Sequence, residues 1–196
     1  IGYESVKNLT TGTANTTLGR KALNSADGAE SNNVAIGSSA MQNANNDSTI
    51  KNVAIGTDAM SGATSGALSG NVAVGAYAMD STGSNAQTGT IAIGESALTA
   101  LTSGARNTAI GYTAGSEEVA GNDNTLLGYE ALHDGGGLAN LSNTLIGSYA
   151  GDGAWANNAS SYNTAVGQGT MRGAMDGALH NVSMGFVALT NLTSGD

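Results

Sequence analysis

The sequence predicts an all-β fold, a β-solenoid in which about ten coils of 17–20 residues stack into a rod. A short phrase that ends in Gly recurs along the whole chain, as in NVAIG at 33–37 and NTAIG at 107–111. Gly is frequent, at 30 of 196 residues, and Pro is absent. Glycine at this frequency disfavours long helices, and the absence of Pro indicates that backbone N–H groups are needed almost everywhere.

Each copy of the phrase predicts one short strand. It runs from Asn through a β-branched and a small residue to an aliphatic residue and the closing Gly. Alternation with a period of two places the two larger side chains on one face of a strand of about five residues and the small one, mostly Ala, on the other. The ten copies lie at 15–19, 33–37, 52–56, 71–75, 90–94, 107–111, 124–128, 143–147, 163–167 and 181–185.

The invariant Gly predicts a bend, with a positive φ or a close approach of another backbone. Three positions later stands Ala, usually followed by Leu or Met, as in Ala40-Met41, and this pair predicts a second short strand. The exceptions are Gly115 and Gly151 in the place of Leu or Met, and Thr170 in the place of Ala. The remaining Ser, Thr, Asn, Gly and Asp predict polar turns of variable length.

Stacked copies can pair strand over strand and close a core that no single copy could bury alone. The closing glycines from Gly2 to Gly185 are 17–20 residues apart, which leaves room for two or three short strands per coil. At the usual strand spacing, ten coils form a rod about 50 Å long. We expect 1–196 to be one repeat array and, because it begins at Ile1 without Met or a signal peptide, a segment of a longer fibre protein.

The first residue of the phrase is Asn in nine of ten copies, and Thr90 is the exception. Stacked amides, one per coil, can hydrogen-bond to one another and to the backbone of the turn, which predicts a structural Asn ladder. Its members are Asn15, Asn33, Asn52, Asn71, Asn107, Asn124, Asn143, Asn163 and Asn181.

The small number of apolar positions in each coil favours association between chains. Ordering a coil costs conformational entropy that three apolar columns offset only in part, so burial of further surface would help. We expect the Ala face of the strand to permit the close approach of another chain.

The phrase N-[TV]-A-[IV]-G-x-x-A-[LM], with NTAIGYTA at 107–114, resembles the head repeats of trimeric autotransporter adhesins and the related repeats of bacteriophage tail fibres. The resemblance covers essentially the whole chain. It implies a left-handed parallel β-roll, a parallel homotrimer made with two further copies of the chain, and a rod that holds a host-binding surface away from its anchor. Adhesin heads have shorter repeats than this chain, which favours the fibre relatives.

Aromatic residues gather near the bend and are candidates for contact with the sugar faces of a host glycan. The alternative is that they pack in the turn or in a groove between chains. Trp155 lies in a long polar segment and is expected to be exposed. The candidate receptor-binding residues are Tyr77, Tyr112, Tyr129, Tyr149, Trp155 and Phe186.

Composition argues against several other classes. Six Lys and Arg against fifteen Asp and Glu, with no basic cluster, disfavour a nucleic-acid surface. No apolar run is long enough to insert in a membrane, and there is no Cys. His133 and His180 stand in separate copies without a recurring nucleophile, and Glu117-Glu118 is expected to be a solvated pair. Acidic turn residues lack calcium-loop spacing, so we predict no catalytic residue, metal or cofactor.

The predicted function is therefore a non-enzymatic segment of a homotrimeric extracellular fibre, on a phage tail or a bacterial surface. It would act as a rigid spacer and a multivalent surface for a host glycan or protein receptor. Two alternatives are an ice-binding solenoid, which would need an unbroken column of Thr, and a polysaccharide-degrading tailspike-like rod. The Thr column is broken by Val or Ile in half of the copies.

Overall fold

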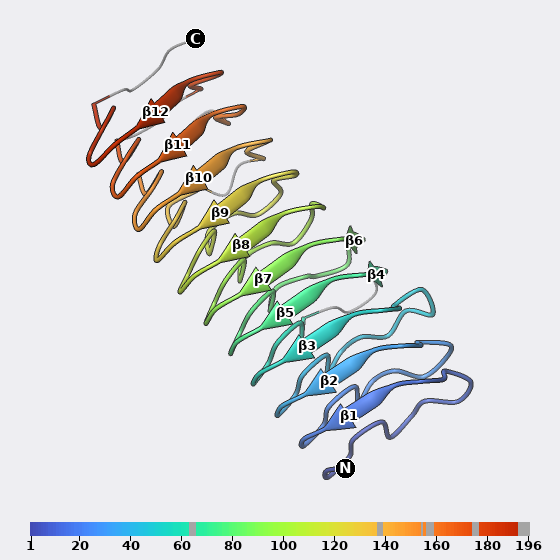
Figure 1. Cartoon of the computed structure of the whole chain (residues 1–196). Coiled ribbons are helices and arrows are strands. Elements are labelled where there is room, and N and C mark those ends of the chain that lie inside the picture. Colours follow the sequence, from blue (N-terminus) through green and yellow to red (C-terminus); the bar gives the residue numbers. More distant parts are fainter. Residues whose placement is uncertain (63–65, 137–138, 154, 156–158, 174–176, 192–196) are drawn as a thin grey trace.

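A computed structural model describes the chain except residues 63–65, 137–138, 154, 156–158, 174–176 and 192–196. The described residues contain strands and turns and no helix, and they form a rod with β1 at one end and β12 at the other (Figure 1). Ten strands make one parallel sheet whose order follows the sequence. The all-β, parallel solenoid predicted from the repeat is thus confirmed.

The ten strands of this sheet coincide with the ten copies of the phrase. They are β1 (Thr16–Leu18), β2 (Val34–Ile36), β3 (Val53–Ile55), β5 (Val72–Val74), β7 (Ile91–Ile93), β8 (Thr108–Ile110), β9 (Thr125–Leu127), β10 (Thr144–Ile146), β11 (Thr164–Val166) and β12 (Val182–Met184).

Neighbouring strands pair in the register of the phrase. Between β2 and β3, for example, Ala35 lies beside Ala54 and Ile36 beside Ile55. Each column of the sheet therefore repeats one kind of side chain along the rod, as the repeat predicts.

A second, less complete ladder runs along the returning side of the coils. It consists of β4 (Leu68–Ser69) paired with β6 (Gln87–Thr88), together with isolated bridges such as Ser31 to Ile50 and Asn122 to Leu141. These positions lie two or three residues before the first residue of each phrase.

The strands have three residues, shorter than the predicted five, because the chain bends at the closing Gly and turns at the residue before the Asn. The closing Gly bends the chain, as Gly37 does at φ +137°. The residue before the Asn is in the left-handed region, as Asn32 is at φ +60°, so the chain turns a corner immediately before the phrase.

The faces of the strand are opposite to those expected. The central Ala points into the coil and is fully buried, as at Ala35, Ala54 and Ala73, while the β-branched and aliphatic residues face outward. The Ala face is therefore part of the interior and is closed to a second chain. The central Ala residues share the core with the fully buried Leu and Met side chains of the turn.

The Ala-Leu/Met pair forms a turn and not the predicted second strand. Ala40 and Met41 are consecutive, yet both are fully buried, which the alternation of a strand does not allow. Met41 reaches this position with φ +51°, in the left-handed region. Its N–H still donates to the carbonyl of Ala59 in the next coil, at 2.9 Å, so the stacking is preserved.

Exceptions to the repeat compensate one another in the core. Leu126 stands where most copies have the central Ala, and its side chain occupies the space beside Gly115, where a Cβ would lie 2.8 Å from its Cδ1. In the same way, Leu145 and Trp155 lie where Gly151 has no side chain. The Thr170 hydroxyl donates to that of Ser183, at 2.8 Å, so both buried exceptions are paired.

Candidate functional site

The Asn ladder is a column of hydrogen bonds inside the rod, unbroken except at Thr90. Asn52 shows the pattern: its side-chain oxygen accepts from the backbone N–H of Asn71 at 2.9 Å and from the Asn71 amide at 3.2 Å. The Asn52 amide donates to the carbonyl of Leu68 at 2.8 Å, on the returning part of the coil. Each Asn therefore joins two coils and closes its own, which suits a structural role better than ligand binding.

The ladder is interrupted at Thr90. The N–H of Thr90 donates to the side chain of Asn71 at 2.9 Å, but its buried hydroxyl has no partner among the described residues. Nor does the backbone N–H of Asn107 have an acceptor there, whereas the N–H of Asn124 finds the Asn107 oxygen at 3.0 Å. Thr has no amide with which to continue the column.

A second polar column lies inside the rod, three residues before the first residue of each phrase, and sequence reasoning missed it. Its polar members are fully buried, and the backbone carbonyl of each accepts from a ladder Asn. The side chains differ from coil to coil, which left no repeating signal in the sequence. They are Glu30, Thr49, Gln87, Asn140 and Ser160.

Glu118 contacts this column and is fully buried, so the expectation of a solvated Glu117-Glu118 pair is wrong for Glu118. Its carboxylate accepts from the Asn140 amide at 2.8 Å. Burial raises the pKa of Glu118 to about 7, although its hydrogen bonds act in the opposite direction. The polar neighbours of Glu118 in the sequence gave no sign that the coil would enclose it.

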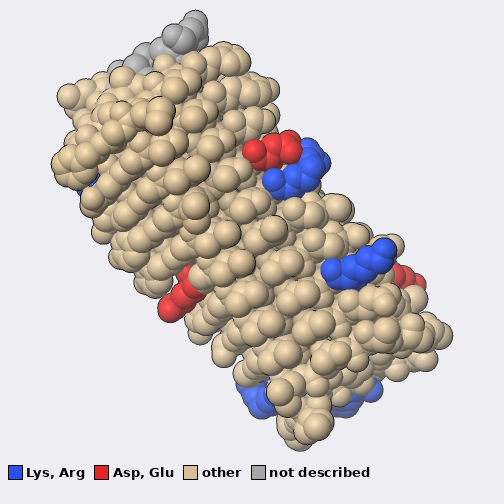
Figure 2. Space-filling model, in the orientation of Figure 1, with Lys and Arg blue, Asp and Glu red and all other residues tan. Residues whose placement is uncertain are grey.

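The outward side chains of the ten-stranded sheet form a strip along the whole rod, which we call the outer face. No strand of this sheet contains a charged residue. Leu18 is 51% exposed, Ile93 37% and Met184 73%, so large apolar side chains remain in contact with solvent along its length. In the view of Figure 2, charged side chains lie toward the margins and ends of the rod, and the strip between them carries none.

Three of the predicted receptor residues lie together at the bend that follows the outer face. Tyr112 and Tyr129 stack with their ring centroids 5.4 Å apart, and Tyr149 meets Tyr129 edge-on at 5.3 Å. The guanidinium of Arg172 lies over the Tyr149 ring, 4.7 Å from its centre. We call these four residues the tyrosine row. A hydrogen bond to Glu130 is the main cause that raises the pKa of Tyr129 to about 12.

The other candidates are scattered. Tyr77 and Phe186 are exposed at bends of different coils, away from the tyrosine row in sequence. Trp155 is fully buried, so the expectation that it is exposed is wrong. Its indole occupies the space that Gly151 leaves beside Leu145, and this large apolar area outweighs the polarity of the segment.

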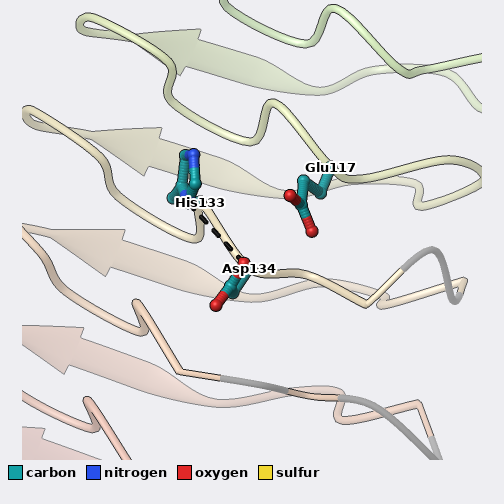
Figure 3. Close-up of side chains that lie close together, drawn as sticks. All are labelled: Glu117, His133 and Asp134. Atoms are coloured by element: carbon teal, nitrogen blue, oxygen red, sulfur yellow. Dashed lines mark ion pairs between the residues drawn. The ribbon is translucent and has the colours of Figure 1, made fainter.

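The acidic clusters of the sequence have different surroundings. Asp123 accepts two hydrogen bonds from Arg106, at 2.6 and 2.8 Å. Asp134 and Asp152, from successive coils, instead each place a carboxylate oxygen near His133 Nδ1, at 3.7 and 3.9 Å. Figure 3 shows His133 and Asp134 with Glu117 from the preceding coil. The sequence did not indicate this grouping, because Glu117 becomes a neighbour of His133 and Asp134 only when the coils stack.

Comparisons with protein-family models, with characterised proteins and with solved structures find no match for this chain. Among the described residues, no helix is long and apolar enough to cross a membrane.

Proposed function

We propose that this chain is a repeat segment of a homotrimeric extracellular fibre, of the phage tail-fibre or bacterial trimeric-adhesin type. It acts as a rigid spacer and presents many weak contacts to a host glycan or protein receptor. The resemblance of the repeat phrase to these families adds left-handed coils and three parallel chains to the proposal.

The main observation that supports this proposal is the outer face. Ten strands at about 4.8 Å and three residues of about 3.3 Å describe an uncharged strip of roughly 48 by 10 Å. The strip is uncharged throughout, and its column of aliphatic residues before the closing Gly is apolar in every strand, whereas the other outward column is Thr in some strands and Val or Ile in others. Extended surfaces with exposed apolar side chains mark interaction sites. Because every coil contributes the same columns, a second copy can meet the strip along its full length.

The interior supports the role of spacer. Each coil is joined to the next by the Asn ladder and by backbone hydrogen bonds such as Val53 N–H to Asn71 O at 2.9 Å. Contacts between coils repeat along the entire rod, so the segment resists bending at any single point. A rigid rod with little surface charge suits a filament that separates a receptor-binding surface from its anchor.

The tyrosine row supports the role of receptor surface. The exposed rings of Tyr112 and Tyr129 and the half-buried ring of Tyr149 form a ridge on which sugar rings can stack, and Arg172 adds hydrogen-bond donors. A ridge that extends over several coils matches a chain-like ligand such as a polysaccharide better than a small molecule.

The test is the native mass of the purified chain by light scattering, together with gel electrophoresis in SDS with and without boiling. A trimer that resists SDS until boiled supports the proposal and justifies a search for its receptor on glycan arrays. A folded monomer at concentrations well above micromolar contradicts it.

One observation favours an ice-binding solenoid as a second candidate. The first residue of each strand faces outward, and Thr108, Thr125, Thr144 and Thr164 form four consecutive outward threonines. The column continues as Val or Ile through β2 to β7, which interrupts the array. A thermal-hysteresis assay on the folded chain separates this candidate from the fibre.

A further inference from the structure

The side chains around His133 form a cluster that neither the fibre proposal nor the ladder uses. One ligand atom from each of Glu117, His133 and Asp134 lies within 4.8 Å of the other two. Glu117 comes from the coil of β8, and His133 and Asp134 come from the coil of β9, so the parallel stacking brings them to one side of the rod (Figure 3).

The distances fit an ion better than direct bonds between the side chains. His133 Nδ1 is 3.7 Å from Asp134 Oδ1 and 3.9 Å from Asp152 Oδ1, which is too long for a hydrogen bond. Ligands about 2.0–2.1 Å from a tetrahedral ion are roughly 3.4 Å apart, so small side-chain rotations would suffice. Among the described residues, Glu117, His133 and Asp134 make no side-chain hydrogen bond that an ion would have to break.

The local charge is negative. Glu117, Asp134 and Asp152 surround His133, and Arg172 is the cation that pairs with Asp152, at 3.5 Å. The Asp152 side chain is only 13% exposed, so its charge is poorly screened by solvent. A bound cation would be attracted to this group of carboxylates.

We propose that Glu117, His133 and Asp134 form a binding site for a divalent transition-metal ion of the zinc type, with a fourth position open to water. The imidazole of His133 indicates the kind of ion, because Ca²⁺ and Mg²⁺ prefer oxygen ligands alone, whereas Zn²⁺ binds imidazole together with carboxylate. The site lies within one chain and does not depend on the proposed trimer. It sits beside the tyrosine row through Arg172, which pairs with Asp152 and covers Tyr149.

The test is isothermal titration of the untagged, chelator-treated chain with Zn²⁺, supported by the visible absorption of bound Co²⁺. We expect one saturable Zn²⁺ site per chain. The visible absorption bands of bound Co²⁺ should be those of an ion with fewer than six ligands. His133→Ala should weaken Zn²⁺ binding at least roughly 10-fold, since the loss of a residue that only orients a ligand already costs that much. Glu117→Gln should weaken it as well.

His180→Ala is the matched control, because the His180 ring stacks on Tyr162, 5.0 Å away, in a different column of the rod. It should bind Zn²⁺ as the wild type does, and both His variants should keep the wild-type circular dichroism. The proposal is overturned if no saturable Zn²⁺ binding occurs. It also fails if His133→Ala binds Zn²⁺ as tightly as His180→Ala, or if equimolar Ca²⁺ displaces the ion.

Discussion

At Gly56 the backbone of one coil meets the backbone of the next. Its φ is +140°, and a Cβ there would lie 2.3 Å from the carbonyl oxygen of Gly75. The same contact recurs along the column of closing glycines. Glycine is therefore required at this position for the spacing of the coils and not only for the bend.

Gly56→Ala should destabilise the rod by more than about 3 kcal/mol, because the added methyl pushes two coils apart. Gly89→Ala is the control: Gly89 also has a positive φ, +65°, but the nearest atom to its Cβ would be 3.9 Å away. Its cost should be only about 1–2 kcal/mol, from the left-handed backbone alone. Denaturant unfolding followed by circular dichroism compares the two. Equal losses would refute the role assigned to backbone contact.

Glu118 makes stability depend on pH. Its pKa is raised in the folded chain to about 7 from an ordinary value of 4.5, so the folded state binds the proton more tightly. The contribution of Glu118 to stability is full below pH 4.5 and is lost as the pH rises through 7. By the usual conversion, a shift of this size corresponds to about 3 kcal/mol.

Glu118→Gln should therefore remove a fall in unfolding free energy between pH 5 and pH 8 that the wild type shows. Glu95→Gln, at an exposed position, should leave this fall unchanged. Both comparisons are made in the presence of a chelator, so that metal binding does not contribute. An identical pH dependence in all three proteins would show that Glu118 titrates normally.

At the scale of the element, the repeat predicted the strands and their register, because Asn, the alternating residues and Gly recur together in each copy. It did not predict which face is inside. A period of two requires Ala35 and Ile36 to point in opposite directions, but the width of the coil decides which direction is the core. The choice depends on how the strand packs against other parts of the coil, such as the buried Met41 of the turn, and the pattern of the strand itself does not contain this information.

The turn at Ala40-Met41 was missed for a related reason. Two consecutive inward side chains require a left-handed backbone at Met41, which nothing in that side chain favours locally. Trp155 was misplaced although a signal existed: Gly151 lacks the Leu or Met side chain of other copies, and a large residue nearby could fill the gap. The His133 cluster required the register between coils before its residues could be seen as neighbours.

The interruption of the Asn ladder gives a prediction at this scale. Thr90→Asn should stabilise the rod by about 1 kcal/mol or more, because it gives the N–H of Asn107 an acceptor and removes a buried hydroxyl without a partner. The reverse change, Asn124→Thr, should cost at least as much, since it leaves Asn143 without its ladder acceptor. Denaturation midpoints measure both changes. A loss of stability in Thr90→Asn would contradict the ladder account.

At the scale of the whole molecule, one uncharged strip follows the length of the rod, and one ridge of rings spans the three successive coils of Tyr112, Tyr129 and Tyr149. Both arise from the same cause, since parallel stacking in register multiplies whatever one copy of the repeat carries at each position. Thirty glycines and the absence of Pro are the composition that such stacking requires. The columns that differ from coil to coil, at the bends and turns, are where the chain carries individual groups such as His133 and Tyr129.

The central claim is that copies of this chain associate through the outer face. The most direct measurement is the native mass, by light scattering, of the variant Ile55→Glu with Ile93→Glu, beside the wild type. Thr88→Glu is the control, since it adds a charge at an exposed strand position in the other sheet. We expect trimers for the wild type and for Thr88→Glu and a folded monomer for the double variant. A double variant that remains trimeric would show that the outer face is not the interface.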